Sequence, residues 1–232
     1  MDKKEVVAVF DEEAVDGALA DLAMWCTLHK GEFLDDAWTA FEALCGDEVS
    51  FDGCEGIVQT LVNLAFTEWV MFDSKVFGRG CIDEYLDRVE GVSDQNRAIL
   101  GELRDSARFG LFRYEGLFED GSGDKGIVVS DALYGRSFKV YSAYLHGLAI
   151  ERSFEPGTGL SARIAILEGR AYFVGQFPAH DKASVDESET LNLYRRCREI
   201  GFPFIAAMAA STLAPNGMFS GSMVARVTEP AA

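Results

Sequence analysis

Positive charge is scarce in this sequence of 232 residues. Its 21 lysine and arginine residues face 38 acidic residues, which gives a formal net charge of -17 at neutral pH. Such an acidic surface repels the phosphates of nucleic acids and of anionic membranes, and it keeps a protein in solution. We therefore expect a chain that binds neither nucleic acid nor a membrane surface.

Long apolar runs and paired cysteines are also missing. The longest uncharged and mostly apolar stretch, residues 202–215, is too short to cross a bilayer. The first ten residues, MDKKEVVAVF, have no cleavage site of small residues and are not expected to be a signal peptide. No C-x-x-C pair occurs, so the cysteines suit reduced thiols in a cytoplasmic protein. The five cysteines are Cys26, Cys45, Cys54, Cys81 and Cys197.

Catalytic motifs are not apparent either. His29, His146 and His180 form neither an H-E-x-x-H nor an H-x-E pattern, and the sequence contains no Walker A motif and no G-x-S-x-G elbow. Two alternatives stay open for the cysteines: a Cys–His dyad assembled by the fold, or buried inert thiols. The second is favoured, because the cysteines fall mostly on apolar helical faces. The sequence therefore indicates no catalytic residue.

The loop at residues 120–126, DGSGDKG, partly matches two ligand-binding motifs, one for dinucleotides and one for calcium. Its glycines spell G-x-G-x-x-G, but a strand is predicted to follow where a dinucleotide site needs a helix. Asp120 and Asp124, with Asp131 further on, resemble a calcium-binding loop, but Lys125 stands where an EF-hand requires glycine. We interpret the loop as a hairpin turn and expect no cofactor and no metal.

The hydrophobic pattern divides the chain into three parts. Apolar residues alternate with period two only between residues 109 and 176, which predicts short strands separated by glycine-rich turns. The predicted strands are 109–118, 126–131, 136–142, 144–150, 161–168 and 170–176. Elsewhere the spacing is helical. The predicted helices are 12–29, 35–45, 55–72, 82–89, 94–106 and 185–200, and 202–212 is expected to be a further helix or a buried segment.

The expected fold class is α+β. An N-terminal helical bundle, residues 1–107, precedes an antiparallel β-meander or small barrel, residues 108–178, since barrel closure removes exposed strand edges. The C-terminal helices and tail, residues 179–232, are expected to pack on the rest.

Short segments at the ends of these parts predict two further strands, a linker and a helix cap. Residues 6–10 and 222–227 are each expected to add one strand, and residues 179–183, AHDKA, are expected to form a polar linker. Ser184 and Glu187 make an S-x-x-E capping box for the helix that follows.

One charge stands out in the most apolar predicted helix, residues 55–72. On a helical wheel Glu68 lies at the edge of the apolar arc, where a carboxylate must be paired, protonated or hydrated. One interpretation is an acid with a shifted pKa in a cleft. The interpretation that we favour is a buried ion pair with Arg79, Arg104 or Arg108.

Two blocks resemble an uncharacterised bacterial family. Residues 66–86, FTEWVMFDSKVFGRGCIDEYL, are similar to its block FxxWfxFDxxxxxGxTxlexFl. The β region that follows in the family is similar to LRDSARFGLFRYEGLF, VVSDALYGRSFKVYSAYLHGLAI and LSARIAILEGRAYFVG here. The resemblance covers residues 66–176, and it implies a helical block joined to a small β-barrel without an established activity. Some members carry a zinc-binding SEC-C tail, but no cysteine cluster follows the β region here, so no metal is carried over.

The function that these observations favour is that of a non-catalytic interaction or regulatory protein in the cytoplasm, with a protein partner. The alternative is a small-molecule-binding protein or enzyme whose pocket lies between the helical bundle and the β domain, where ligand sites commonly form. A cleft with converging polar groups would favour the alternative, and an apolar surface patch would favour the interaction protein.

Overall fold

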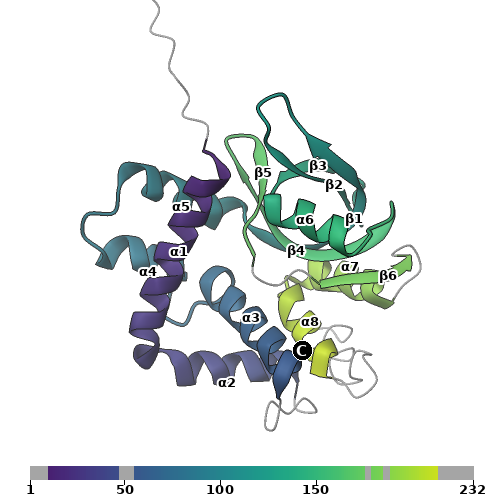
Figure 1. Cartoon of the computed structure of the whole chain (residues 1–232). Coiled ribbons are helices and arrows are strands. Elements are labelled where there is room, and N and C mark those ends of the chain that lie inside the picture. Colours follow the sequence, from purple (N-terminus) through teal and green to yellow (C-terminus); the bar gives the residue numbers. More distant parts are fainter. Residues whose placement is uncertain (1–9, 47–54, 176–178, 185–188, 214–232) are drawn as a thin grey trace, which may run out of the picture.

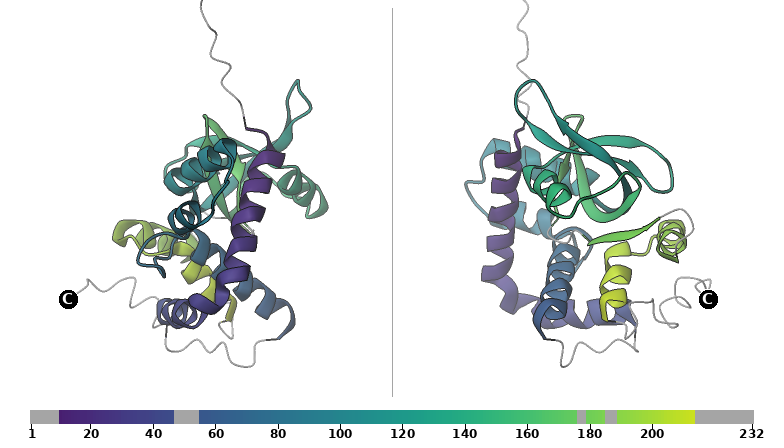
Figure 2. Two further views of the ribbon diagram at one scale, coloured as in Figure 1. Left: turned by 90° about the vertical axis from the view of Figure 1, so that its left-hand side faces the viewer. Right: turned by 45° about the vertical axis from the view of Figure 1, so that its right-hand side comes forward.

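The computed structural model describes residues 10–46, 55–175, 179–184 and 189–213. A closed five-stranded barrel lies beside helices that come from both ends of the chain (Figure 1). The predicted α+β class is thereby confirmed. Figure 2 shows the barrel above α3 and α8, with α1 running along one side.

The first helices follow the capping signals in the sequence. Helix α1, Glu12–His29, begins after Asp11, whose Oδ1 accepts a hydrogen bond from the Ala14 N–H at 2.8 Å. A short 3-10 turn, η1 (Lys30–Glu32), leads into α2, Leu34–Cys45, which ends at Gly46. At Gly46 φ is 102°, a backbone conformation that glycine adopts without strain.

Three further helices complete the N-terminal part. Helix α3, Gly56–Phe72, is apolar around much of its circumference, and α4 spans Cys81–Arg88. Helix α5, Asp94–Ser106, begins after Ser93, whose hydroxyl accepts a hydrogen bond from the Asn96 N–H at 3.1 Å.

The barrel is built from β1 (Arg108–Glu119), β2 (Lys125–Asp131), β3 (Ser137–Tyr141), β4 (Thr158–Leu167) and β5 (Arg170–Phe173). The strands follow the order β1-β2-β3-β5-β4, and pairing of β4 with β1 closes the ring. All of these pairs are antiparallel except β3 with β5. This order, with a helix between β3 and β4, is the Greek-key arrangement of OB-type barrels. Because such folds host many activities, function must be argued from sites.

Alternation along the strands separates two hydrophobic cores. Phe112, Leu160, Ala162 and Ile164 point into the barrel with Ile127, Val129 and Val140. Phe109, Leu111, Ala165 and Leu167 point the other way, into a larger core shared with the helices. The barrel therefore has its own interior, and its outer face is also buried by the helical part.

One predicted strand is wrong. Residues 144–150 belong to helix α6, Ala143–Glu151, which begins after Ser142. The Ser142 hydroxyl accepts a hydrogen bond from the Leu145 N–H at 3.2 Å, and Leu145 and Ala149, four residues apart, are buried against the barrel. A short apolar run bounded by polar residues fits both the helical period of 3.6 residues and the strand period of two. Periodicity alone therefore does not distinguish a helix from a strand here.

The predicted polar linker is also wrong, because residues 179–184 form strand β6 (Ala179–Ser184), which pairs antiparallel with β4. The backbone finds hydrogen-bond partners on the free part of β4, and a polar sequence does not prevent this. The capping box at Ser184 and Glu187 and the expected strands at 6–10 and 222–227 lie wholly or partly outside the described residues, and Phe10 is not in a strand.

The C-terminal helices return to the N-terminal part. Helix α7, Glu189–Ile200, packs against β1, and α8, Phe204–Leu213, packs against α2, α3 and β1. The contact face of α8 consists of small buried residues: Ala206, Ala207, Ala209 and Ala210. No helix among the described residues combines the length and the hydropathy that a membrane span requires.

The closest backbone approach in the barrel predicts which glycine cannot be replaced. A Cβ on Gly126 in β2 would lie 1.9 Å from the Val140 carbonyl oxygen in β3, whereas a Cβ on Gly116 in β1 would meet nothing within 4 Å. We expect Gly126→Ala to lower the free energy of unfolding by about 1–3 kcal/mol or more, measured by urea denaturation. Gly116→Ala is the matched control and should stay within about 0.5 kcal/mol. Equal stabilities of the two variants would contradict the β2–β3 register.

Candidate functional site

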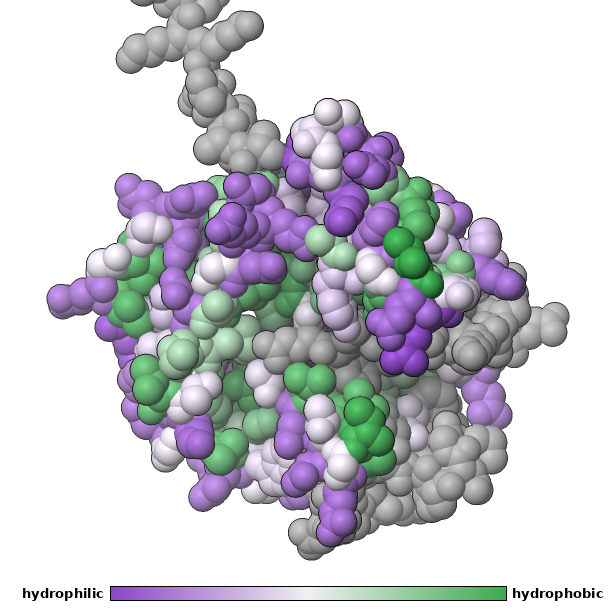
Figure 3. All heavy atoms as spheres, in the orientation of Figure 1, coloured by the Kyte–Doolittle hydropathy of each residue, from purple (hydrophilic) through white to green (hydrophobic). Residues whose placement is uncertain are grey.

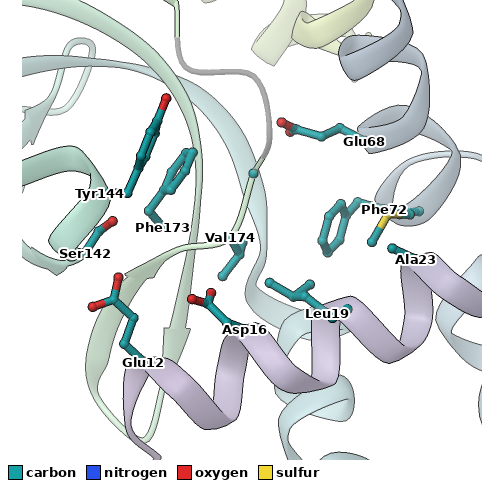
Figure 4. A pocket seen from close by; sticks show the side chains of 13 residues that line it. Glu12, Asp16, Leu19, Ala23, Glu68, Phe72, Ser142, Tyr144, Phe173 and Val174 are labelled. Atoms are coloured by element: carbon teal, nitrogen blue, oxygen red, sulfur yellow. The ribbon is translucent and has the colours of Figure 1, made fainter. Parts of the chain in front are cut away.

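A cleft of about 360 Å³ lies where the helical part meets the barrel. We call it the junction cleft. Helix α1 forms one wall, α3 forms another, and the end of β5 with the start of α6 faces them (Figure 4). Its lining comprises Glu12, Asp16, Leu19, Ala20, Ala23, Glu68, Met71, Phe72, Ser142, Tyr144, Phe173, Val174 and Gly175. The space-filling view in Figure 3 shows hydrophilic residues above a hollow in this face, and apolar residues inside it.

Glu12 connects the beginnings of two helices. It lies in the first turn of α1, and its two carboxylate oxygens accept the Ala143 N–H of α6 at 2.9 and 3.1 Å. Burial raises the pKa of the Glu12 carboxyl, while the Ala143 N–H and the Ser142 hydroxyl partly offset this rise and nearby Asp16 adds to it. This acid therefore has a structural role at the rim of the cleft.

Asp16 lies one turn further along α1 and has no such role. No described residue donates a hydrogen bond to its carboxylate. Partial burial raises the pKa of the Asp16 carboxyl, although the residue as a whole is still exposed to water. A carboxylate that loses hydration without gaining a donor is poised to accept a positively charged group.

Next to these acids the cleft is apolar. Leu19, Phe72 and Val174 belong to this part of its lining (Figure 4). Tyr144 and Phe173 form an aromatic wall, with ring centroids 5.9 Å apart and planes inclined by 21°. Acids at the rim and rings below give the cleft an amphipathic lining.

Glu68 enters the cleft from α3 as part of a buried ion cluster. Its side chain is 1% exposed and its Oε2 accepts from Nε of Arg163 in β4 at 3.2 Å; Arg163 is 0% exposed. Asp73, just after α3, accepts from both terminal nitrogens of Arg163 at 2.5 and 3.4 Å. The guanidinium carbon of Arg163 also lies 4.6 Å from the centre of the Phe72 ring. One barrel arginine thus holds two acids of the helical part.

The predicted partners of Glu68 are wrong. Arg79 pairs with Glu84 and Asp87, and Arg104 pairs with Asp83 and Asp105. Arg108 donates to the backbone carbonyls of Asp105 and Ala107. The wheel placed Glu68 correctly in the interior, but nearness in the chain did not indicate the partner, which lies 95 residues away.

The other residues considered for chemistry are not brought together. Nδ1 of His29 lies 3.0 Å from the Trp25 carbonyl oxygen, and its ring stacks on the Trp25 indole. Cys26 and Cys81 are buried with their sulfur atoms 3.1 Å apart. Within the described part of the chain no cysteine is hydrogen-bonded to a histidine, and Cys54 lies outside it.

The loop between β1 and β2 is a turn stabilised by its own side chains. Asp120 accepts from the backbone N–H groups of Ser122 and Asp124 at 2.9 and 3.1 Å. Asp131 is at the opposite end of β2, where it accepts from the N–H groups of Leu133 and Tyr134. In the described ranges, no three His, Cys, Asp or Glu side chains are close enough together to hold a metal ion.

Comparison with protein-family models, with curated proteins and with solved structures finds no match to this chain. The resemblance of residues 66–176 to an uncharacterised bacterial family therefore stays a prediction.

Sequence reasoning missed Arg163, Glu12 and Asp16. A signal for Arg163 was present, because it is the one charge in the apolar strand LSARIAIL. Glu12 and Asp16 are four residues apart and share a face with Leu19 and Ala23, but they look like solvated acids until the barrel is placed beside α1.

The buried cluster predicts a large loss of stability when one partner is removed. We expect Glu68→Ala to lower the free energy of unfolding by about 1.5–3 kcal/mol, because the buried Arg163 loses one charged hydrogen-bond partner and keeps only Asp73. Glu68→Gln should cost less, since the amide oxygen still accepts one hydrogen bond. Combining Glu68→Ala with Arg163→Met should cost less than the sum of the single changes. Glu199→Ala, which breaks the exposed pair with Arg196, is the control and should stay within about 0.5 kcal/mol. Additive costs in urea denaturation would contradict the coupling.

Neutralising Asp16 is expected to stabilise the protein at neutral pH, whereas the changes at Glu68 destabilise it. The pKa of the Asp16 carboxyl is higher in the folded protein than its value of 3.8 in the unfolded chain. The protonated acid therefore stabilises the fold at low pH, and this stabilisation is lost as pH rises from 3.8 through the raised pKa. Asp16→Asn should therefore be more stable than the parent at pH 7, by up to about 0.5 kcal/mol for this exposed position, and the difference should vanish near pH 3.

Glu13→Gln is the matched control for this change. Glu13 lies in the first turn of α1, where a charge is favoured by the helix dipole, so its neutralisation should destabilise at pH 7. Urea denaturation at both pH values measures both variants. A loss of stability in Asp16→Asn at pH 7 would contradict a desolvated carboxylate.

Proposed function

We propose that this chain is a non-catalytic binding protein for a small amphipathic cation, an organic amine with an apolar body, held in the junction cleft. The observation that carries the proposal is the lining: three carboxylates, no basic side chain among the described lining residues, and an apolar base with an aromatic wall. Of the two functions expected from the sequence, this one develops the small-molecule alternative.

The charges of the cleft favour an amine. Arg163 compensates Glu68, and hydrogen bonds hold Glu12, which leaves Asp16 as the lining carboxylate that no described residue pairs with or donates to. The ring face of Tyr144 adds a surface on which a cation is attracted. The net charge of -17 raises the local concentration of cations around the protein. Since the carboxylates do not converge on a point, the lining suits an extended organic cation better than a metal ion.

The same lining gives little support for catalysis. Its hydroxyl groups belong to Ser142, which caps α6, and to Tyr144. No histidine or cysteine is among the described lining residues, so a nucleophile with an adjacent base is not assembled there. This supports a binding role.

An interaction role and nucleic-acid binding receive less support. Large exposed apolar side chains occur on several separate elements, with Met24 and Leu28 on α1, Ile57 on α3 and Ile150 on α6. OB-type barrels contact oligonucleotides through the face of strands 2 and 3 and through the β1–β2 and β4–β5 loops, and these loops here carry Asp120, Asp124 and Glu168. We therefore maintain the expectation that the protein does not bind nucleic acid.

Isothermal titration with a charged and an uncharged probe tests the proposal. We expect 1-naphthylmethylamine to bind about tenfold or more tightly than 1-naphthylmethanol, because only the amine forms a charge-assisted hydrogen bond. Asp16→Asn should remove most of this difference. Glu13→Gln, which removes the same charge outside the lining, should retain it.

Two results would overturn the proposal. One is equal binding of amine and alcohol, and the other is an equal effect of Asp16→Asn and Glu13→Gln. Binding of the amine should also weaken as pH falls into the range of the raised pKa of Asp16 and Glu12, because their neutral forms no longer attract a cation.

A further inference from the structure

A second cavity, of about 410 Å³, opens at the end of the barrel where β2 turns into β3, beside α7. We call it the barrel mouth. The Phe112 and Phe138 rings in its floor meet edge to face, with centroids 6.4 Å apart. Ile164 and Ile166 complete this apolar floor. A Cβ on Gly110 would come within 2.9 Å of the Tyr194 hydroxyl and 3.2 Å of the Phe112 ring. The absence of a side chain at Gly110 therefore allows these two groups to lie close to β1.

Three exposed arginines surround the floor, although the protein as a whole is acidic. They are Arg108 at the start of β1, Arg136 before β3 and Arg198 in the last turn of α7. Among the described residues, no carboxylate lies within ion-pair distance of any of the three. Within the described part of the chain, the barrel mouth therefore holds three arginines without an ion-pair partner.

The fold holds two of these guanidinium groups in position. Arg108 donates to the backbone carbonyls of Asp105 at 3.0 Å and Ala107 at 2.6 Å, which satisfies part of its donor set and leaves its charge. The guanidinium carbon of Arg136 lies 5.2 Å from the centre of the Phe138 ring. Positioned guanidinium groups next to aromatic rings suit an aromatic anion, because arginine binds phosphate and carboxylate groups through two parallel hydrogen bonds.

Asp131, the one acid among the described lining residues, is already engaged. One oxygen accepts from the N–H groups of Leu133 and Tyr134 at 2.8 and 2.9 Å, and the other accepts from the Tyr194 hydroxyl at 3.3 Å. Asp131 therefore closes the β2–β3 turn and holds α7 through Tyr194, and its charge is partly satisfied by these donors.

We infer that the barrel mouth binds a small organic anion: an aromatic ring system that carries one phosphate or carboxylate group. The ring would contact the apolar floor, and the anionic group would pair with Arg198 and Arg136 at the rim. The cavity has the volume of a small-ligand pocket. A long polyanion is disfavoured, because beyond the rim it meets the surface of a protein with net charge -17.

Titration of the full-length chain at low ionic strength tests the inference. The probes are 1-naphthyl phosphate, 1-naphthoate, 1-naphthol and inorganic phosphate. We expect at least one of the two aromatic anions to bind about tenfold or more tightly than both naphthol and inorganic phosphate, with weaker binding as salt is added. Comparison of the phosphate with the carboxylate identifies the preferred anionic group.

Matched variants on α7 locate the site. Arg198→Gln should weaken the aromatic anion about tenfold or more. Arg195→Gln removes the same charge from the same helix but outside the lining, and it should leave the affinity nearly unchanged. Because Arg198 is exposed and has no ion pair in the described chain, its variant should unfold within a few degrees of the parent, with a small loss from the helix dipole at the end of α7.

The inference would be overturned if neither aromatic anion bound at millimolar concentration, or if naphthol bound as tightly as the anions. Equal effects of Arg198→Gln and Arg195→Gln would also overturn it. So would a single-stranded oligonucleotide that bound more tightly than the small anions. Asp16→Asn in the junction cleft should not affect the anion, which separates this site from the amine site.

Discussion

The arrangement of the molecule depends on the buried contact of Arg163 with Glu68 and Asp73. A guanidinium group that is 0% exposed has lost its hydration, and it is stable there only because two carboxylates and the Phe72 ring replace the water. Since Arg163 belongs to β4 and the acids belong to α3 and its end, the cluster fixes the barrel against the helical part. A Cβ on Gly175 would come within 2.8 Å of the Glu68 carboxylate, so the chain after β5 passes close to this cluster as well.

That docking creates the junction cleft and also determines its charge. With the barrel against α1, Glu12 reaches the start of α6 and Asp16 loses part of its hydration. The barrel mouth, in contrast, is lined by three arginines that form no ion pair with a described residue. One barrel thus carries two cavities of opposite charge at different places, which agrees with the general observation that a fold supplies a scaffold and that its local residues supply the chemistry.

The desolvated acids of the cleft have a stability cost. A raised carboxyl pKa means that the charged form is less stable in the folded protein than in the unfolded chain, so at neutral pH these groups oppose folding. Natural proteins commonly accept such costs where a site needs a particular charge, and stabilising replacements there tend to reduce function. Asp16 fits this pattern better than Glu12, which gains the Ala143 hydrogen bonds in return.

The sequence by itself determined the local elements: the cap at Asp11, the helices before and after the β region, most strands, and the interior position of Glu68. These follow from short-range periodicity and capping, which act within a few residues. Only the tertiary structure decided that 144–150 is a helix, that 179–184 pairs with β4, and that Arg163 is the partner of Glu68. Both cavities belong to the same group, because their walls join residues far apart in the chain. Pairing across such separations depends on how surfaces dock, and local periodicity contains no information about that docking.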